Sequence, residues 1–257
     1  MIKIKMAQSS GLKGIFFDYG GVLEDLEYGE TTVRRGVEVL HALLSEREVH
    51  ATPGLLFEML NRGQEEYSRW YSSHDYKELP NEEMWSSFFL KELCIDPEVN
   101  AIVQGISEEL SSIFEFYLYK RRPVKEVRTV LKTLFYSGYT LAIISNTISR
   151  TLIPERLSKY GIADFFSKVF LSVKVGVRKP SAEIFQMAIK SMDLDPNGCM
   201  FVGDTLSRDV EGARNAGFGS VVLMPSALTD LKDRGYTGGA KPDHTLHTLE
   251  DIYALLG

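Results

Sequence analysis

Short apolar runs alternate with helical segments along much of the chain, and this alternation restricts the fold more than any other feature. The runs are bounded by turn residues, which is typical of strands buried in a sheet. They occupy residues 14–17, 140–144, 168–173, 199–202, 220–224 and, as a short sixth run, 244–246. Strands joined by helices form right-handed crossovers in a parallel sheet that is covered on both faces. The sequence therefore predicts an α/β fold with a Rossmann-like parallel sheet in a three-layer αβα core.

The span between the first two predicted strands is different, because its pattern is helical and lacks the alternation of a strand. Thr52 and Pro53 make a good helix start, and Pro97 opens a later helix. We therefore predict an all-helical cap domain that is inserted into the core. The predicted parts are a core of residues 14–25 and 122–257, a cap of residues 26–121 and an N-terminal extension of residues 1–13.

Charged and aromatic residues of this span have ordinary structural explanations. Arg121 and Arg122 would close the last cap helix, where cations suit the helix dipole, and we interpret them as a solvated basic end. Glu24 and Asp25 are interpreted as solvated linker carboxylates. Aromatic residues at helical spacing are more often core than ligand contacts, although some can serve as both. They are Tyr67, Trp70, Tyr71, Trp85, Phe88 and Phe89.

The composition excludes several classes of partner. The 257 residues carry a formal charge of −6, and the basic residues are scattered, so we expect neither a nucleic acid nor a membrane as partner. Two cysteines at unrelated spacing argue against a disulfide framework and favour a cytoplasmic location. No apolar run approaches the ~20 residues that span a bilayer, and residues 1–13 lack the apolar segment of a secretory signal.

Polar and charged residues follow several predicted strands at their carboxyl ends. In a parallel sheet these ends meet at one edge, where open α/β sheets bind ligands. The residues that we expect there are Asp18, Ser145, Asn146, Asp204 and Asp209, with Lys179 before a proline. Each is a weak signal alone, and their order along the chain makes the combination specific.

With these residues, the chain resembles the haloacid dehalogenase-like hydrolase superfamily, in the branch with an all-helical cap inserted after the first strand. The resemblance extends from Gly14 onward, and its most specific part is GDTLSRDVEGA at residues 203–213. It implies that Asp18 is a covalent nucleophile toward phosphorus and that Lys179 holds both Asp18 and a phosphate oxygen. Ser145, Asn146 and backbone amides near Gly20 and Gly21 would bind the phosphoryl group.

Charge supports a metal cofactor. Three carboxylates and one lysine would leave the site about two units negative and repel a phosphate dianion. Mg²⁺ prefers oxygen ligands and would restore the balance. The expected ligands are Asp18, the Gly20 carbonyl and Asp204, with Asp209 as a ligand or as support for one.

One position departs from the family pattern. Phosphatases of this superfamily usually carry a second Asp two residues after the nucleophile as general acid and base, whereas this chain has Gly20. We therefore expect a Mg²⁺-dependent hydrolase of small phosphate monoesters that favours easily expelled leaving groups or borrows an acid such as Glu24 or Asp25. The alternatives are a metal-independent 2-haloacid dehalogenase that uses Asp18 on carbon, and a weakly active or inactive phosphate-binding module.

The substrate would be a small phosphorylated metabolite that the cap contacts when it closes over the site. Tyr28, Arg34, Arg62, Tyr67 and Trp70 are the candidate contacts in the cap. The oligomeric state is expected to be monomeric or homodimeric.

Overall fold

The computed structural model describes residues 11–256, and its centre is a parallel sheet. Within these residues the sheet has six strands in the order β5-β4-β1-β6-β7-β8. Their bounds are β1 Gly14–Phe17, β4 Thr140–Ser145, β5 Lys168–Leu171, β6 Cys199–Gly203, β7 Ser220–Leu223 and β8 His244–Thr245. The predicted parallel α/β core is confirmed. Most of the predicted N-terminal extension lies outside the described residues.

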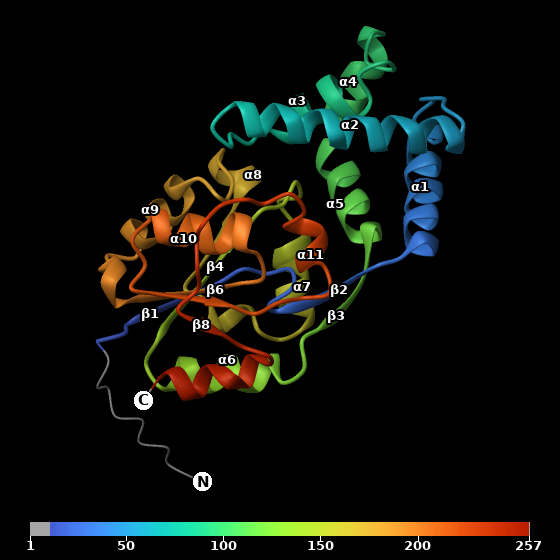
Figure 1. Ribbon diagram of the computed structural model, residues 1–257. Coiled ribbons are helices and arrows are strands. Elements are labelled where there is room, and N and C mark those ends of the chain that lie inside the picture. Colours follow the sequence, from blue (N-terminus) through green and yellow to red (C-terminus); the bar gives the residue numbers. More distant parts are fainter. Residues whose placement is uncertain (1–10, 257) are drawn as a thin grey trace.

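Helices cover both faces of this sheet (Figure 1). Side chains of β1 alternate between the two faces, since Ile15 and Phe17 join one hydrophobic cluster and Phe16 joins the other. The first cluster includes α6 Val127–Tyr136, α7 Leu152–Lys159 and the 3₁₀ helix Leu249–Leu255, and the second includes α9 Ala182–Ser191 and α10 Glu211–Asn215. Burial of apolar residues on both faces explains why the strands are nearly continuous apolar runs.

A second group of helices lies beyond the carboxyl edge of the sheet and has a hydrophobic cluster of its own (Figure 1). The predicted last cap helix is divided, because Ile106 leaves the helical conformation at φ −113° and ψ 14°. Trp85 and Phe89 are buried in this cluster, as predicted for core aromatics. The helices are α1 Glu30–Ser45, α2 Pro53–Ser73, α3 Asn81–Met84 with a π-helical turn at Trp85–Phe89, α4 Pro97–Gly105 and α5 Ser107–Leu118.

The two segments that enter and leave this helical group form an antiparallel pair. Strand β2 Glu24–Tyr28 pairs with β3 Tyr119–Pro123. The interpretation of Arg121 as part of a solvated helix end is wrong, because it lies in β3 with only 8 % of its side chain exposed and pairs with Glu24 at 2.7 Å. Both predicted boundaries of the cap fall inside this strand pair.

The helical group also contacts the core directly. Two glutamates of α5 accept hydrogen bonds from core backbone amides: Glu115 from Ile148 at 3.0 Å, and Glu108 from Arg150 at 2.8 Å. Between α2 and α3, Glu78 accepts two hydrogen bonds from Arg178 of the core at 2.8 Å. These contacts hold the helices over the carboxyl edge of the sheet.

Among the described residues, no helix combines the length and the apolar character of a membrane span.

Candidate active site at the carboxyl edge of the sheet

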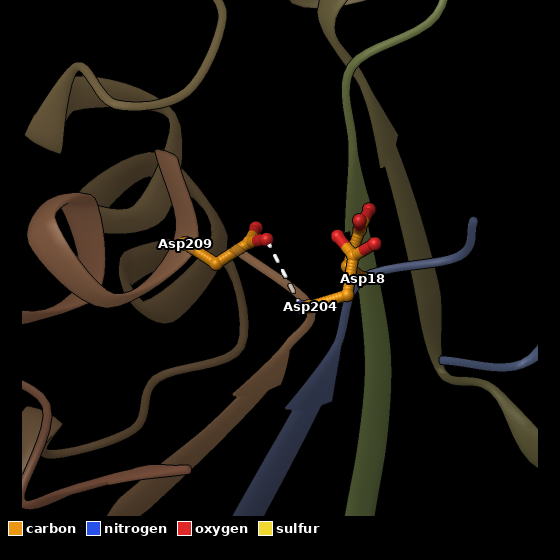
Figure 2. A group of neighbouring side chains, drawn as sticks. All are labelled: Asp18, Asp204 and Asp209. Carbon is orange, nitrogen blue, oxygen red and sulfur yellow. Dashed lines mark hydrogen bonds between the residues drawn. The ribbon is translucent and has the colours of Figure 1, made fainter. Parts of the chain in front are cut away.

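Three aspartates meet where β1 and β6 end. Asp18 follows β1 and Asp204 follows β6, and these two strands are hydrogen-bonded neighbours. Asp209 lies five residues further in the π-helical turn Leu206–Val210 and points back toward Asp204 (Figure 2). One carboxylate oxygen from each lies within 4.8 Å of the others, and all three residues are buried. The structure thus brings together the three carboxylates that the sequence placed at this edge.

Lys179 connects two of these carboxylates. Its Nζ lies 2.8 Å from Oδ1 of Asp18 and 2.6 Å from Oδ1 of Asp209, and its side chain is buried. Burial lowers the pKa of an ammonium group, but the attraction of Asp18 and Asp209 outweighs burial here and raises the pKa of Lys179. Lys179 therefore stays protonated and holds a positive charge beside Asp18.

Asp209 has partners for both of its oxygens. Oδ1 accepts from Lys179, while Oδ2 accepts from the amides of Asp204 and Thr205 at 3.2 and 3.1 Å. Gly203 allows this approach, since a Cβ there would lie 2.3 Å from Cβ of Asp209. Burial raises the pKa of the Asp209 carboxyl, but Lys179 and the hydrogen bonds dominate and lower it. In this structure Asp209 positions Lys179 and the Asp204 loop.

Asp204 is buried and incompletely paired. Its Oδ2 accepts from Ser226 Oγ at 2.6 Å and from Lys232 Nζ at 2.7 Å, while its buried Oδ1 has no partner among the described residues. Burial raises the pKa of its carboxyl, and Lys232 opposes that shift. Gly21 is needed next to it, because it has φ +99° and a Cβ there would lie 2.3 Å from Oδ2.

These residues fit a divalent cation. The Asp18 and Asp204 carboxylates and the Gly20 carbonyl are all oxygen donors, as Mg²⁺ requires, and the unpartnered Oδ1 of Asp204 is an acceptor without a donor. Mg²⁺ also binds through only one or two carboxylates, which agrees with the engagement of both Asp209 oxygens elsewhere.

Ser145 and Asn146 lie beside Asp18 at the end of the neighbouring strand β4, and both line the same cavity. The Asn146 amide is already engaged, because its Nδ2 donates to the Lys179 carbonyl at 2.9 Å and its Oδ1 accepts from the Lys179 amide at 2.8 Å. Asn146 therefore fixes the backbone of Lys179. Ser145 is buried and lines the cavity.

A cavity of about 260 Å³ separates this edge from the helical group. Of the five candidate cap contacts, Tyr67 lines the cavity, and the other four are not among its lining residues. Arg34 pairs with Glu30, Arg62 pairs with Glu92, Trp70 stacks on Tyr67, and Tyr28 is 56 % exposed. Lining residues that the sequence did not single out for this role include Gln64, Ser68, Glu115, Tyr119, Arg208 and Lys232.

Leu26 occupies the space beside Gly20. A Cβ at position 20 would lie 2.8 Å from Leu26 Cδ1, which is closer than ordinary van der Waals contact.

The interpretation of Glu24 as a solvated linker carboxylate is also wrong. Glu24 is fully buried and accepts from Arg121, Arg156 and Tyr160 at 2.7, 2.7 and 2.6 Å. It is therefore engaged in a buried network, whereas Asp25 pairs at the surface with Arg122 at 3.1 Å.

The sequence of the chain is similar to those of known hydrolases. The family model described as haloacid dehalogenase-like hydrolase matches residues 12–217. A glyceraldehyde 3-phosphate phosphatase of Methanothermobacter thermautotrophicus is 38 % identical over 111 residues, which are 43 % of this chain and 48 % of that protein. A phosphoserine phosphatase of Thermus thermophilus is 32 % identical over 138 residues, 50 % of this chain and 55 % of that protein. The chain thus matches about half the length of these curated relatives.

A crystal structure of a 2-haloacid dehalogenase from Pseudomonas syringae pv. Tomato superposes with a TM-score of 0.63 at 20 % identity, covering 95 % of this chain and 98 % of that one. A HAD phosphatase from Thermococcus onnurineus superposes with a TM-score of 0.55, also at 20 % identity, covering 96 % and 98 %. Both similarities concern the fold, which the two proteins share although their named activities differ.

Proposed function

Because the chain belongs to the haloacid dehalogenase-like hydrolase family, we propose that it hydrolyses small organic phosphate monoesters, with Asp18 as nucleophile and Mg²⁺ as cofactor. The observation that carries the proposal is the pair of buried carboxylates of Asp18 and Asp204, with Lys179 beside Asp18 and the Gly20 carbonyl near Asp204. An oxygen-donor cation site next to a carboxylate and a fixed ammonium is suited to phosphoryl transfer, which depends mainly on positioning and charge stabilisation.

Asp18 performs the first chemical step. One of its oxygens attacks phosphorus and forms an acyl phosphate, while the bond to the leaving oxygen breaks and that oxygen keeps the electron pair. Water then attacks phosphorus and the bond between phosphorus and Asp18 breaks, which releases inorganic phosphate and restores the carboxylate. The proton that the water loses and the proton that the departed oxygen gains are exchanged with solvent. Lys179, 2.8 Å from Asp18, stays protonated and attracts the phosphoryl oxygens. Bound Mg²⁺ supplies the remaining positive charge that a phosphate dianion needs at this site.

The leaving oxygen has no carboxylic acid at position 20 to protonate it. Both acids considered from the sequence have other partners and neither lines the cavity: Glu24 is held by Arg121 and Arg156 in a buried network, and Asp25 pairs at the surface with Arg122. We therefore infer a preference for leaving groups that need little protonation, since a positioned general acid typically contributes about 10²–10⁴-fold.

The cavity supports a small molecule as substrate. Its volume of about 260 Å³ suits a phosphorylated metabolite of a few carbons, and Arg208 offers a guanidinium on its wall. The named activities of the curated relatives, on glyceraldehyde 3-phosphate and phosphoserine, concern compounds of this class. We extend the proposal to a cytoplasmic enzyme that acts as a monomer or homodimer.

The test compares Asp18→Asn with Asp25→Asn on an aryl phosphate, with and without Mg²⁺. Asp25 is a matched control, because it is a carboxylate of the same segment that pairs at the surface with Arg122. We expect turnover that requires Mg²⁺, is abolished in Asp18→Asn and persists in Asp25→Asn. Phosphate binding without turnover on a broad panel would support a binding module instead, and chloride release from 2-chloropropionate without metal would establish a dehalogenase.

A further inference from the structure

The segment 226–233 is attached to the Asp204 loop by several hydrogen bonds. Ser226 Oγ donates to Asp204 Oδ2 at 2.6 Å, and Thr229 Oγ1 donates to the Asp204 carbonyl at 2.7 Å. Asp233 accepts from the amides of Leu206 and Ser207 at 2.8 and 2.9 Å. These bonds fix the short helix α11 Thr229–Lys232 over the end of β6. The segment is therefore part of the site, although its sequence has no motif.

Lys232 ends this helix and reaches into the carboxylate group. Its Nζ lies 2.7 Å from Asp204 Oδ2 and 3.2 Å from the Gly20 carbonyl oxygen, and its side chain is 17 % exposed. These two oxygens belong to the set that fits a divalent cation. The ammonium group is therefore already bonded to two of the groups, the Asp204 carboxylate and the Gly20 carbonyl, that would hold a metal.

We propose that Lys232 is a built-in competitor of the metal, whose ammonium occupies the cation position of the metal-free protein and leaves it when the metal binds. The inference rests on the metal site of the proposed function. It assigns to Lys232 a role in setting metal affinity, which is separate from the roles of Asp18 and Lys179.

Local charge explains why the metal-free site needs this lysine. Lys179 pairs with Asp18 and Asp209, so Lys232 is the one cation within salt-bridge distance of Asp204 among the described residues. Asp204 is fully buried, and an unpaired buried carboxylate is strongly destabilising. With Lys232 in place, three carboxylates face two ammonium groups, and one negative charge remains.

Exchange is sterically possible because Lys232 also lines the cavity. Its flexible four-carbon stem lets the ammonium turn away from Asp204 without moving the backbone of α11, which the bonds of Thr229 and Asp233 hold. A bound metal would then supply the positive charge that Asp204 lacks once the Lys232 ammonium group has turned away. Such competition raises the apparent dissociation constant in inverse proportion to the fraction of open sites, so that sites open about 1–10 % of the time bind roughly 10–100-fold more weakly.

The experiment measures metal binding by the free protein, without substrate. Mn²⁺ is titrated into wild type and Lys232→Met, the free ion is followed by electron paramagnetic resonance, and Mg²⁺ is added as competitor. Arg208→Met is a control for local charge, because Arg208 lines the same cavity but donates to neither Gly20 nor Asp204. Lys241→Met is a control for net charge at an exposed position. Lys232→Gln serves as a second variant if Lys232→Met does not fold.

We expect Lys232→Met to bind Mn²⁺ and Mg²⁺ roughly tenfold more tightly or better, and both controls to remain within about threefold of wild type. The metal-free variant should also melt at lower temperature than wild type, and saturating Mg²⁺ should remove most of that difference. Unchanged or weaker metal binding in Lys232→Met would overturn the inference about Lys232 but not the proposed function. An increase in metal affinity in Arg208→Met as large as that in Lys232→Met would do the same. If neither wild type nor Lys232→Met binds metal, the Mg²⁺ site of the proposed function fails as well, while the Asp18→Asn assay still tests the nucleophile independently.

Discussion

Restoring a carboxyl group at position 20 should increase turnover in a way that depends on the leaving group. In Gly20→Asp the new Cβ would lie 2.8 Å from Leu26 Cδ1, and ordinary contact requires at least 3.4 Å. The single variant must therefore displace Leu26, so the informative variant is Gly20→Asp combined with Leu26→Ala. Leu26 is 8 % exposed, and its replacement by Ala should lower the free energy of unfolding by about 2–3 kcal/mol. This is the low end of the range for a buried leucine, because Leu26 borders a cavity.

The assay compares kcat/KM on an alkyl phosphate and on an aryl phosphate with a good leaving group. A positioned general acid contributes about 10²–10⁴-fold where the leaving oxygen needs a proton, so we expect the double variant to gain on the alkyl substrate and little on the aryl one. Leu26→Ala alone and Gly20→Asn with Leu26→Ala are the controls for cavity shape and for side-chain volume. Equal gains on both substrates, or equal gains from Asn and Asp, would refute the reasoning about the missing acid.

Three further predictions concern buried charges. Glu24→Gln should lower the free energy of unfolding by about 3–5 kcal/mol, because Arg121 then lacks its buried partner, and should leave the pH profile of kcat unchanged, whereas an altered profile would identify Glu24 as the acid. Glu78→Gln should also lower the free energy of unfolding by about 3–5 kcal/mol, measured with urea, because Arg178 is left unpaired. The double variant Glu78→Gln with Arg178→Met should recover part of that free energy, and a loss equal to the sum of the two single losses would contradict this. The pKa of Asp209 is lowered in the fold, so its contribution to stability is present above its unfolded pKa of about 3.9 and is lost as pH falls through the lower folded pKa. The stability gap between wild type and Asp209→Asn should therefore narrow on acidification to about pH 3 in urea unfolding, and a constant gap would contradict this.

The sequence predicted the sheet edge well, because the pattern of buried parallel strands determines which residues follow a strand end. Asp18, Ser145 and Asp204 come together from distant parts of the chain since β1 pairs with both β4 and β6. Asp209 could be expected near Asp204 because a single helical turn separates them.

Features set by long-range packing could not be predicted in the same way. Lys232 lies in a four-residue helix after β7, and only the fold brings it to the Gly20 carbonyl, 212 positions earlier in the chain. Glu24 and Arg121 lie in polar segments whose composition is typical of a surface linker, and their burial follows from the pairing of β2 with β3. Four of the five proposed cap contacts do not line the cavity, because helical periodicity identifies the buried face of a helix but not the part of that face that borders a cavity.

The central claim, that Asp18 is a covalent nucleophile, is tested most directly by trapping the phosphorylated enzyme. The protein is mixed with Mg²⁺ and an aryl phosphate, quenched in acid during turnover, digested and analysed by mass spectrometry. We predict one phosphoryl group on the peptide that contains Asp18, and none on that peptide in Asp18→Asn. Two results would contradict the account while wild type releases phosphate: a phosphoryl group on another residue, or an unmodified Asp18 peptide. The second result counts only under conditions that preserve acyl phosphates.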